Sequence, residues 1–114
     1  MHDEIRLDDI DEWLERGASI VDVRETWEYE RGHIPGAISI PMGEVVARQD
    51  EIAGPVVLVC ATGNRSGRVA EFLVKQGRTQ VANLLGGTVE WIEEGRTVES
   101  GSPSAGGAGA GERS

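Results

Sequence analysis

The sequence is poor in cysteine and histidine. Its 114 residues contain one cysteine, Cys60, and two histidines, His2 and His33. One cysteine excludes an intramolecular disulfide, and these three side chains are too few for a closed structural zinc site, so we expect no metal and no other cofactor. A free thiol is typical of a reducing compartment, and we therefore expect a cytoplasmic protein.

Positive charge and long apolar runs are also scarce. The chain has 11 Lys and Arg residues against 20 Asp and Glu residues, a formal net charge of -9. This charge repels nucleic acid phosphates and anionic membrane surfaces, so we expect neither as a partner. No stretch approaches the ~20 apolar residues of a membrane span, and no apolar run of signal-peptide length follows the acidic N-terminus. A small anionic substrate remains compatible, because arginine and backbone N–H groups can reverse the potential inside one pocket.

Length and composition together predict the domain organisation. Residues 1–99 suffice for one domain with a single modest hydrophobic core. Residues 100–114 consist mostly of Gly, Ser and Ala and have almost nothing to bury. We predict that these last residues form a disordered tail.

Short apolar runs alternate with amphipathic segments before the tail. This pattern is typical of β-α units and predicts an α/β fold, with a mainly parallel sheet covered by helices on both faces. The predicted strands lie around Ile5 and at residues 19–23, 37–40, 56–59 and 80–84. The predicted helices cover residues 8–16, 65–76 and 88–94, with shorter helical turns at residues 26–31 and 44–47. Helical spacing predicts that Trp13, Trp27 and Trp91 are packing residues rather than a substrate platform.

Residues 55–73 are predicted to form a strand, a loop and a helix, with Cys60 at the end of the strand. Open α/β sheets bind ligands at such a loop, between the carboxyl end of a parallel strand and a helix N-terminus. The first N–H groups of the helix lack partners within it, and Gly63 and Asn64 tolerate the positive φ angles that turn further N–H groups inward. These donors, the helix dipole and Arg65 predict that the pKa of Cys60 lies below that of a free cysteine.

A purely structural role is the alternative for Cys60. A cysteine at the end of an apolar strand is often just a small buried hydrophobic residue. The loop that follows favours chemistry, because a structural cysteine needs no glycine or cation directly before a helix. The loop consists of Ala61, Thr62, Gly63, Asn64, Arg65 and Ser66.

Four segments and one tryptophan carry a resemblance to a known family. The segments are residues 21–25, 28–37, 60–66 and 85–87, and the tryptophan is Trp91. In order and spacing they resemble the signature segments of the rhodanese-like sulfurtransferases, in particular the small single-domain members. One segment would be a weak signal, but the combination, which spans about residues 4 to 99, is specific. The resemblance implies a five-stranded parallel sheet in the order 1-5-4-2-3, with helices on both faces.

The resemblance also implies that Cys60 becomes a persulfide. Its thiolate would attack the sulfane sulfur of a small anionic donor such as thiosulfate, and a thiophilic acceptor would then take the outer sulfur. The N–H groups of residues 61–66 would stabilise the persulfide anion. Because the chain has no second cysteine, the sulfur must leave to an external acceptor: cyanide in an assay, or a thiol or partner protein in the cell.

Two features of the loop bear on substrate choice. Phosphatase relatives carry a C-x5-R loop, whereas Cys60 and Arg65 form the shorter C-x4-R loop, which suits a sulfur atom better than a tetrahedral oxyanion. Position 61 is alanine, where many members that use thiosulfate carry a basic residue. We therefore expect thiosulfate to be a modest substrate.

Four further residues are predicted to support the loop. Asp22 and Arg24 lie at the end of the second strand, and we expect Asp22 to pair with Arg65 and Arg24 with Glu28. Such pairs would position the loop, and the alternative is ordinary ion pairing between neighbouring connections. His33 is expected to be structural, with general-base chemistry as its alternative.

A binding module without catalysis is the alternative function. Many domains of this fold act as docking or regulatory pieces, and the acidic surface would suit that role. An intact nucleophile with its anion-binding loop favours an enzyme, because a scaffold needs neither.

Overall fold

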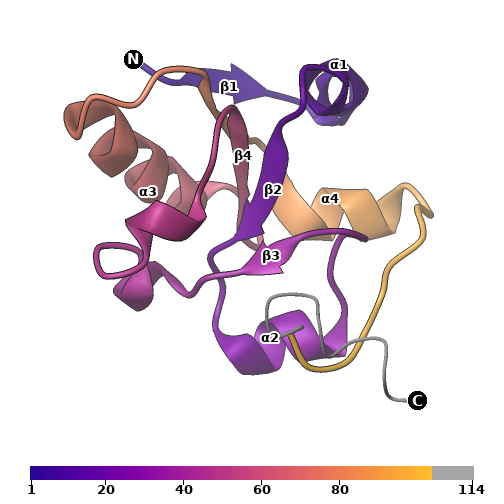
Figure 1. Ribbon diagram of the computed structural model, residues 1–114. Helices are drawn as coiled ribbons and strands as arrows, with labels where there is room; N and C mark the ends of the chain where they lie inside the picture. The colour runs from indigo at the N-terminus through magenta and orange to yellow at the C-terminus, as the bar shows by residue number, and fades with distance from the viewer. Residues whose placement is uncertain (104–114) are drawn as a thin grey trace.

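The computed structural model describes residues 1–103, so most of the tail predicted at residues 100–114 lies outside the described part (Figure 1). The sheet has five strands: β1 (Asp3–Ile5), β2 (Ser19–Asp22), β3 (Ile38–Ser39), β4 (Val56–Val59) and β5 (Val81–Leu84). Their order is β1-β5-β4-β2-β3, and every neighbouring pair is parallel. The predicted α/β fold and strand order are confirmed.

The central strand β4 is apolar at every position because the sheet is covered on both faces. Its four residues, Val-Val-Leu-Val, are all 0% exposed. Alternate side chains of a strand point to opposite faces. Val57 and Val59 therefore join one hydrophobic core, and Val56 and Leu58 join the other.

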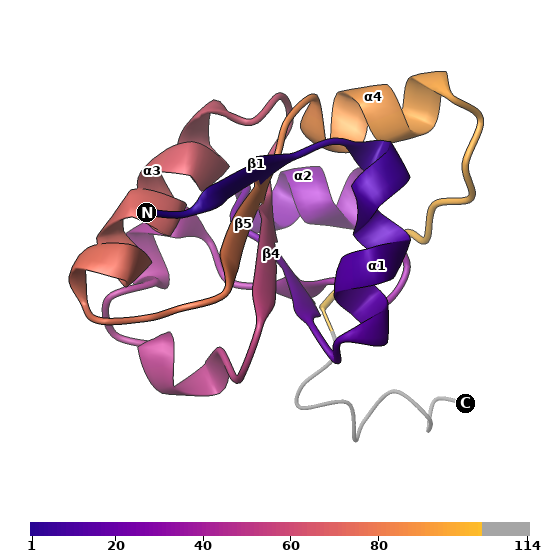
Figure 2. The ribbon, with the colours of Figure 1, turned by 90° about the horizontal axis from the view of Figure 1, so that it is seen from above.

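Helices divide between the two faces of the sheet. Ile10 and Trp13 of α1 (Ile10–Glu15) and Tyr29 of α2 (Thr26–Arg31) belong to the first core, and Trp91 of α4 (Gly87–Glu93) packs against it. The second core contains three residues of α3 (Asn64–Lys75), Val69, Ala70 and Leu73. Seen from above, α1 and α3 lie on opposite sides of the strands (Figure 2).

Two predictions about local structure are wrong. The helical turn predicted at residues 44–47 is replaced by two short 3-10 helices at Met42–Glu44 and Gln49–Glu51. Arg48 joins them by donating to the carboxylates of Glu44 and Glu51, each at 2.7–2.9 Å. The prediction that Trp27 is a packing residue also fails: it is 57% exposed, and the Arg31 guanidinium lies over its ring, 5.1 Å from the centroid.

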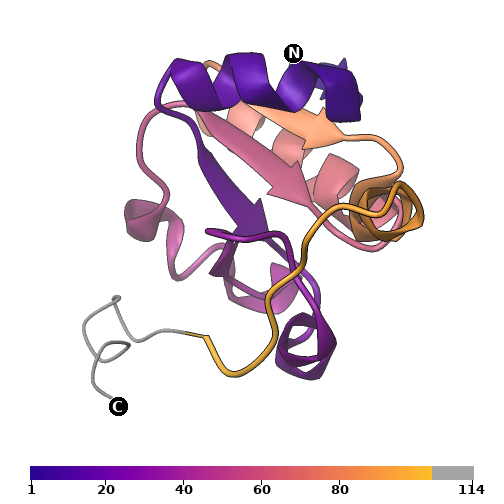
Figure 3. The same cartoon turned by 90° about the vertical axis from the view of Figure 1, so that its right-hand side faces the viewer.

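The segment after α4 returns to α2 and the start of β3 (Figure 3). His33 and Glu99 exchange two backbone hydrogen bonds of 2.8 and 2.9 Å in an antiparallel bridge. The N–H of Gly101 then donates to the carbonyl of Glu30 at 2.8 Å. Across residues 1–103, no helix is long and apolar enough to cross a membrane.

Candidate active site

Cys60 lies at the carboxyl end of β4, directly before the loop that leads into α3. Because β4 pairs with β2 on one side and β5 on the other, the cysteine lies in the middle of the edge where the parallel strands end. The N–H of Val23 donates to the carbonyl of Val59 at 2.9 Å and extends this pairing to the base of the loop. The cysteine is thus placed where sheets of this kind bind ligands.

The loop wraps around the sulfur atom of Cys60. The N–H of Gly63 donates to Sγ at 3.1 Å, and the hydroxyl oxygen of Ser66 lies 3.3 Å from Sγ. Gly63 has a φ of 107°, a conformation that favours glycine. Asn64 tolerates a positive φ but does not take one, because it already begins the right-handed helix α3.

Helix α4 fixes the outer side of the loop. The N–H and the hydroxyl of Thr88 donate to the carbonyl of Cys60 at 2.9 and 3.1 Å, and the N–H of Val89 donates to the carbonyl of Ala61 at 3.0 Å. A side chain at Gly87 would place its Cβ 2.4 Å from the carbonyl oxygen of Cys60. Because α4 binds the Ala61 carbonyl, the N–H of Thr62, which points the opposite way across the same trans peptide, is turned toward the sulfur.

The pKa of Cys60 lies below its ordinary value, in the direction that the sequence predicts. Burial is the largest single influence and raises the pKa. It is outweighed by hydrogen bonds from the Ser66 hydroxyl and from the N–H groups of Ser66, Gly63 and Thr62. The loop therefore favours a thiolate without direct contact from Arg65, whose guanidinium is bound to Glu28.

The predicted partners of the charged residues are wrong. Arg24 pairs with Asp22, with its Nη2 2.7 Å from Oδ2, and also donates to the carbonyl of Gly32 at 2.8 Å. Arg65 instead donates to both carboxylate oxygens of Glu28, at 2.8 and 3.1 Å. Asp22 and Arg24 are two residues apart in an extended strand end, which puts their side chains on one side, so they satisfy each other.

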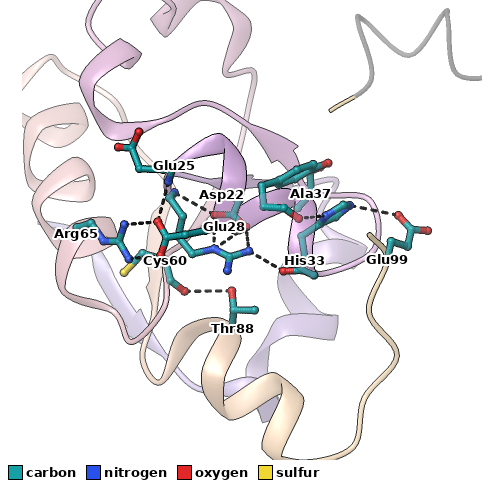
Figure 4. A network of polar contacts seen from close by, with 12 residues as sticks. Asp22, Glu25, Glu28, His33, Ala37, Cys60, Arg65, Thr88 and Glu99 are labelled. Atoms are coloured by element: carbon teal, nitrogen blue, oxygen red, sulfur yellow. Dashed lines mark hydrogen bonds and ion pairs between the residues drawn. The ribbon is translucent and has the colours of Figure 1, made fainter. Parts of the chain in front are cut away.

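The Glu28–Arg65 pair lies beside the sulfur (Figure 4). The hydrogen bond from Arg65 lowers the pKa of Glu28, and the same bond raises the pKa of Arg65. The guanidinium thus stays positive next to Cys60, but most of its charge is balanced by one carboxylate. The pair connects α2 to the first turn of α3 and so joins the loop to the neighbouring helix.

The polar contacts of His33 are with residues other than Cys60. Its ring stacks on that of Tyr29 with centroids 3.6 Å apart, and its Nδ1 lies 2.7 Å from the Tyr29 carbonyl. Its Nε2 lies 3.8 Å from the carboxylate of Glu99, and the Tyr29 hydroxyl donates to the carbonyl of Ala37 at 2.7 Å. These contacts fit a structural residue that holds the turn between α2 and β3.

Asn83 is a site residue that the sequence patterns do not identify. It lies within β5, is 2% exposed, and its Nδ2 donates to the Glu4 carboxylate at 2.9 Å and to the Gly63 carbonyl at 3.1 Å. Its Oδ1 accepts a hydrogen bond of 2.5 Å from the Ser66 hydroxyl. One signal could have revealed it: an amide in an otherwise apolar strand needs buried partners.

Access to the sulfur is narrow, since Cys60 is 1% exposed. A surface cavity of about 660 Å³ lies against α2 and β3, and its lining includes neither Cys60 nor its loop. A cavity of about 310 Å³ borders the loop at Thr62, Gly63 and Asn64. The lining of this smaller cavity includes part of the loop but not Cys60. A molecule that reacts directly with the sulfur must be small, or must reach it with a small group.

Comparison with known proteins relates this geometry to a family. The model of the rhodanese-like domain matches residues 6–94. An uncharacterized protein of Bacillus subtilis, YqhL, is 46% identical over 78 residues, which are 67% of this chain and 62% of that protein. A second Bacillus subtilis relative is 41% identical over 75 residues but is covered over only 40% of its length. The chain therefore spans less than two thirds of these two relatives.

Named and solved relatives extend the comparison. A sulfurtransferase of Allochromatium vinosum is 36% identical over 81 residues, 69% of this chain and 76% of that protein. The crystal structure of a rhodanese-related protein from Thermoplasma volcanium matches with a TM-score of 0.78 at 32% identity, covering 86% of this chain and 98% of that one. A thiosulfate sulfurtransferase from Pseudomonas aeruginosa matches with a TM-score of 0.75 at 29% identity, over 90% of this chain and 21% of that one. With its strand order, its cysteine loop and these matches, the chain belongs to the rhodanese-like domain family.

Proposed function

We propose that the chain is a sulfurtransferase that carries sulfur as a persulfide on Cys60. The observation that carries this proposal is the set of donors around one atom: the N–H of Gly63 at 3.1 Å and the Ser66 hydroxyl at 3.3 Å from Sγ. Donors that lower the pKa of a thiol also stabilise the thiolate, which is the nucleophile. The names of the sulfurtransferase relatives support the same class of reaction.

The proposed reaction has two steps. In the first, the Cys60 thiolate attacks the sulfane sulfur of the donor, the sulfur–sulfur bond of the donor breaks, and the rest of the donor leaves with the bonding electrons. With thiosulfate the leaving group is sulfite. In the second, a thiolate or cyanide attacks the outer sulfur, and Cys60 leaves as a thiolate. The loop N–H groups stabilise the charged sulfur in both steps, as in other anion sites.

The proposed donor is small and anionic, and thiosulfate is expected to be a modest one. Residue 61 is alanine, so it brings no cation to the loop. Arg65 is engaged by Glu28 in two hydrogen bonds and offers little free charge to a dianion. The proposed acceptor is an external thiol or a protein, since the sequence contains no second cysteine. A thiolate of this kind suits the reducing cytoplasm, where we propose that the protein acts.

Intact mass spectrometry tests the proposal. The purified protein is incubated with thiosulfate, and in parallel with a polysulfide as a second sulfane donor. We expect a gain of one sulfur atom, removed by cyanide with release of thiocyanate. Cys60→Ser is the matched control, because the hydroxyl fits the same space but is a poor nucleophile at neutral pH. If no donor adds sulfur to the wild-type chain, the docking-module alternative replaces the enzyme.

A further inference from the structure

The Ser66 hydroxyl lies between two acceptors. Its oxygen is 2.5 Å from Oδ1 of Asn83 and 3.3 Å from Sγ of Cys60. A serine hydroxyl has a single proton, so it can donate fully to only one of them at a time. The shorter contact is the one to Asn83. The Asn83 side chain also contacts Glu4 and Gly63. These two contacts determine which end of its amide faces Ser66, and so whether the short contact is a hydrogen bond from the Ser66 hydroxyl.

The orientation of the Asn83 amide is fixed by these contacts. Its Nδ2 lies 2.9 Å from a carboxylate oxygen of Glu4 and 3.1 Å from the carbonyl oxygen of Gly63. Both partners can only accept, so the two N–H bonds must point at them, and a flipped amide would set three oxygens against one another. Oδ1 therefore faces Ser66 and needs its proton. Without that proton, Oδ1 would be a buried acceptor with no partner.

We propose that Asn83 is a positioning residue that holds the Ser66 proton while the Cys60 sulfur is uncharged and yields it to the sulfur when the thiolate forms. In the thiol state, S–H donates to the Ser66 oxygen and the hydroxyl donates to Asn83. In the thiolate state, the hydroxyl rotates about its C–O bond toward the charged sulfur, and Oδ1 loses its donor. No covalent bond changes in this rotation.

This inference rests on Cys60 being the nucleophile of the proposed function, and it gives Asn83 a part in each step. When the thiolate attacks a donor, Sγ loses its charge and the Ser66 proton returns to Asn83. When the acceptor takes the outer sulfur, charge reappears on Sγ and the proton turns back. Asn83 thereby favours the states in which Sγ is neutral and makes the thiolate less stable than the loop alone would make it.

Other charges near the sulfur must be separated from this effect. Arg65 of α3 is paired with Glu28 of α2, and Asp22 at the end of β2 is paired with Arg24. Glu4 of β1 acts through Asn83 itself. Substituting Asn83 also removes its bond to the loop carbonyl of Gly63, which loosens the loop whatever Ser66 does. A design in which these contributions cancel is therefore needed.

A double-mutant cycle supplies that design. The pH dependence of Cys60 alkylation by iodoacetamide is measured in four chains: wild type, Asn83→Ala, Ser66→Ala and the double variant. The loss of the Gly63 contact shifts the reactivity midpoint equally with and without the hydroxyl. The competition for the proton exists only with the hydroxyl. Asn83→Ala changes the pH midpoint of alkylation in both backgrounds. We expect this change to be more negative, by about one pH unit, in chains that keep Ser66 than in chains that carry Ser66→Ala.

A difference of zero, or one of opposite sign, overturns the proposal and leaves Asn83 as a loop anchor only. Asn83→Val is the second variant: it also lacks an acceptor, fills more of the space, and suits a strand, so it keeps the cycle usable if the alanine variant fails to fold. Melting temperatures and the alkylation rate at high pH, where every chain is a thiolate, report structural damage separately. Alkylation needs no sulfur donor, so the result is independent of whether sulfur transfer is observed.

Discussion

At the scale of single residues, the lowered pKa of Cys60 predicts a pH dependence of stability. Burial opposes ionisation, but the hydrogen bonds of the loop outweigh it, so the folded-state pKa lies below the unfolded value of about 8.5. Between these two pKa values the unfolded chain binds more protons, and the free energy of unfolding rises with pH. The contribution is fully present above the unfolded value and is lost as pH falls through the folded value.

Urea unfolding from pH 6 to 9 measures this contribution. The Cys60→Ser chain provides the baseline, because serine does not ionise in that range. We expect the difference in unfolding free energy between wild type and variant to grow in favour of wild type as pH rises. A difference that stays flat would mean that Cys60 is not stabilised as a thiolate.

Gly87 is the residue where the backbone tolerates a side chain least. Its φ is 51°, and an added Cβ would lie 2.4 Å from the Cys60 carbonyl and 2.6 Å from that of Ala61. We expect Gly87→Ala to destabilise the fold by about 2 kcal/mol or more and to slow alkylation of Cys60, because α4 and the loop must separate. Gly17→Ala is the matched control: φ is also positive, at 90°, but nothing lies within 4 Å. Equal losses of stability in the two variants would mean that the close approach of α4 to the loop does not require glycine at position 87.

Sequence patterns could identify Cys60 as the candidate site residue but not all of its neighbours. Cys60 and its loop follow from local order, a strand, a glycine and a helix start within a few positions. Asn83 and Thr88 lie 23 and 28 residues beyond Cys60, and only strand register and helix docking bring them to it. The sequence does not reveal the role of the Ser66 hydroxyl for the same reason, because that role depends on both Cys60 and Asn83.

At the scale of elements, the end of β2 contains a buried ion pair. The side chains of Asp22 and Arg24 are 1% and 8% exposed. Asp22→Asn should cost about 3 kcal/mol of stability, because it leaves the buried charge of Arg24 without its counter-ion. Chemical denaturation of the variant beside Glu12→Gln tests this. Glu12 pairs with Arg16 on an exposed helix face, where the change should be within about 0.5 kcal/mol. Similar losses in both would remove the case for a special role of the buried pair.

Elements with strong local patterns were predictable, and those defined by tertiary contacts were not. β4 is a short continuous apolar run and α3 has apolar residues at helical spacing, and the sequence predicts both to within one residue at each end. β3 has only two residues, because its length is set by pairing with β2 rather than by its own sequence. The turns around Arg48 depend on two carboxylates that one guanidinium brings together. The swapped partners of Asp22 and Arg65 show the same limit, since charge alone does not determine which pair forms.

At the scale of the whole molecule, the segment after α4 closes the structure against α2. Deleting residues 104–114 should leave the melting temperature unchanged, because those residues carry no large apolar side chain. Deleting residues 97–114 also removes the two His33–Glu99 hydrogen bonds and the hydrogen bond from Gly101 to Glu30. This longer deletion should lower the melting temperature by several degrees. Calorimetry of the two truncated chains compares them. If the shorter deletion is as harmful as the longer, the last residues dock on the domain.

The contacts between α4 and the loop have a consequence for how the molecule comes apart. Only Gly87 and Thr88 of this helix are fully buried, and Val89 and Ile92 are 43% and 52% exposed, so the partly buried Trp91 is the one large side chain that packs it against the first core. Sub-global opening of α4 should therefore need less free energy than exposure of β4, and amide hydrogen exchange should be faster in α4 than in β4. Because the same helix binds the Cys60 carbonyl, each opening releases the sulfur's loop. The thiol would then lose its reactivity at urea concentrations where the sheet is still intact.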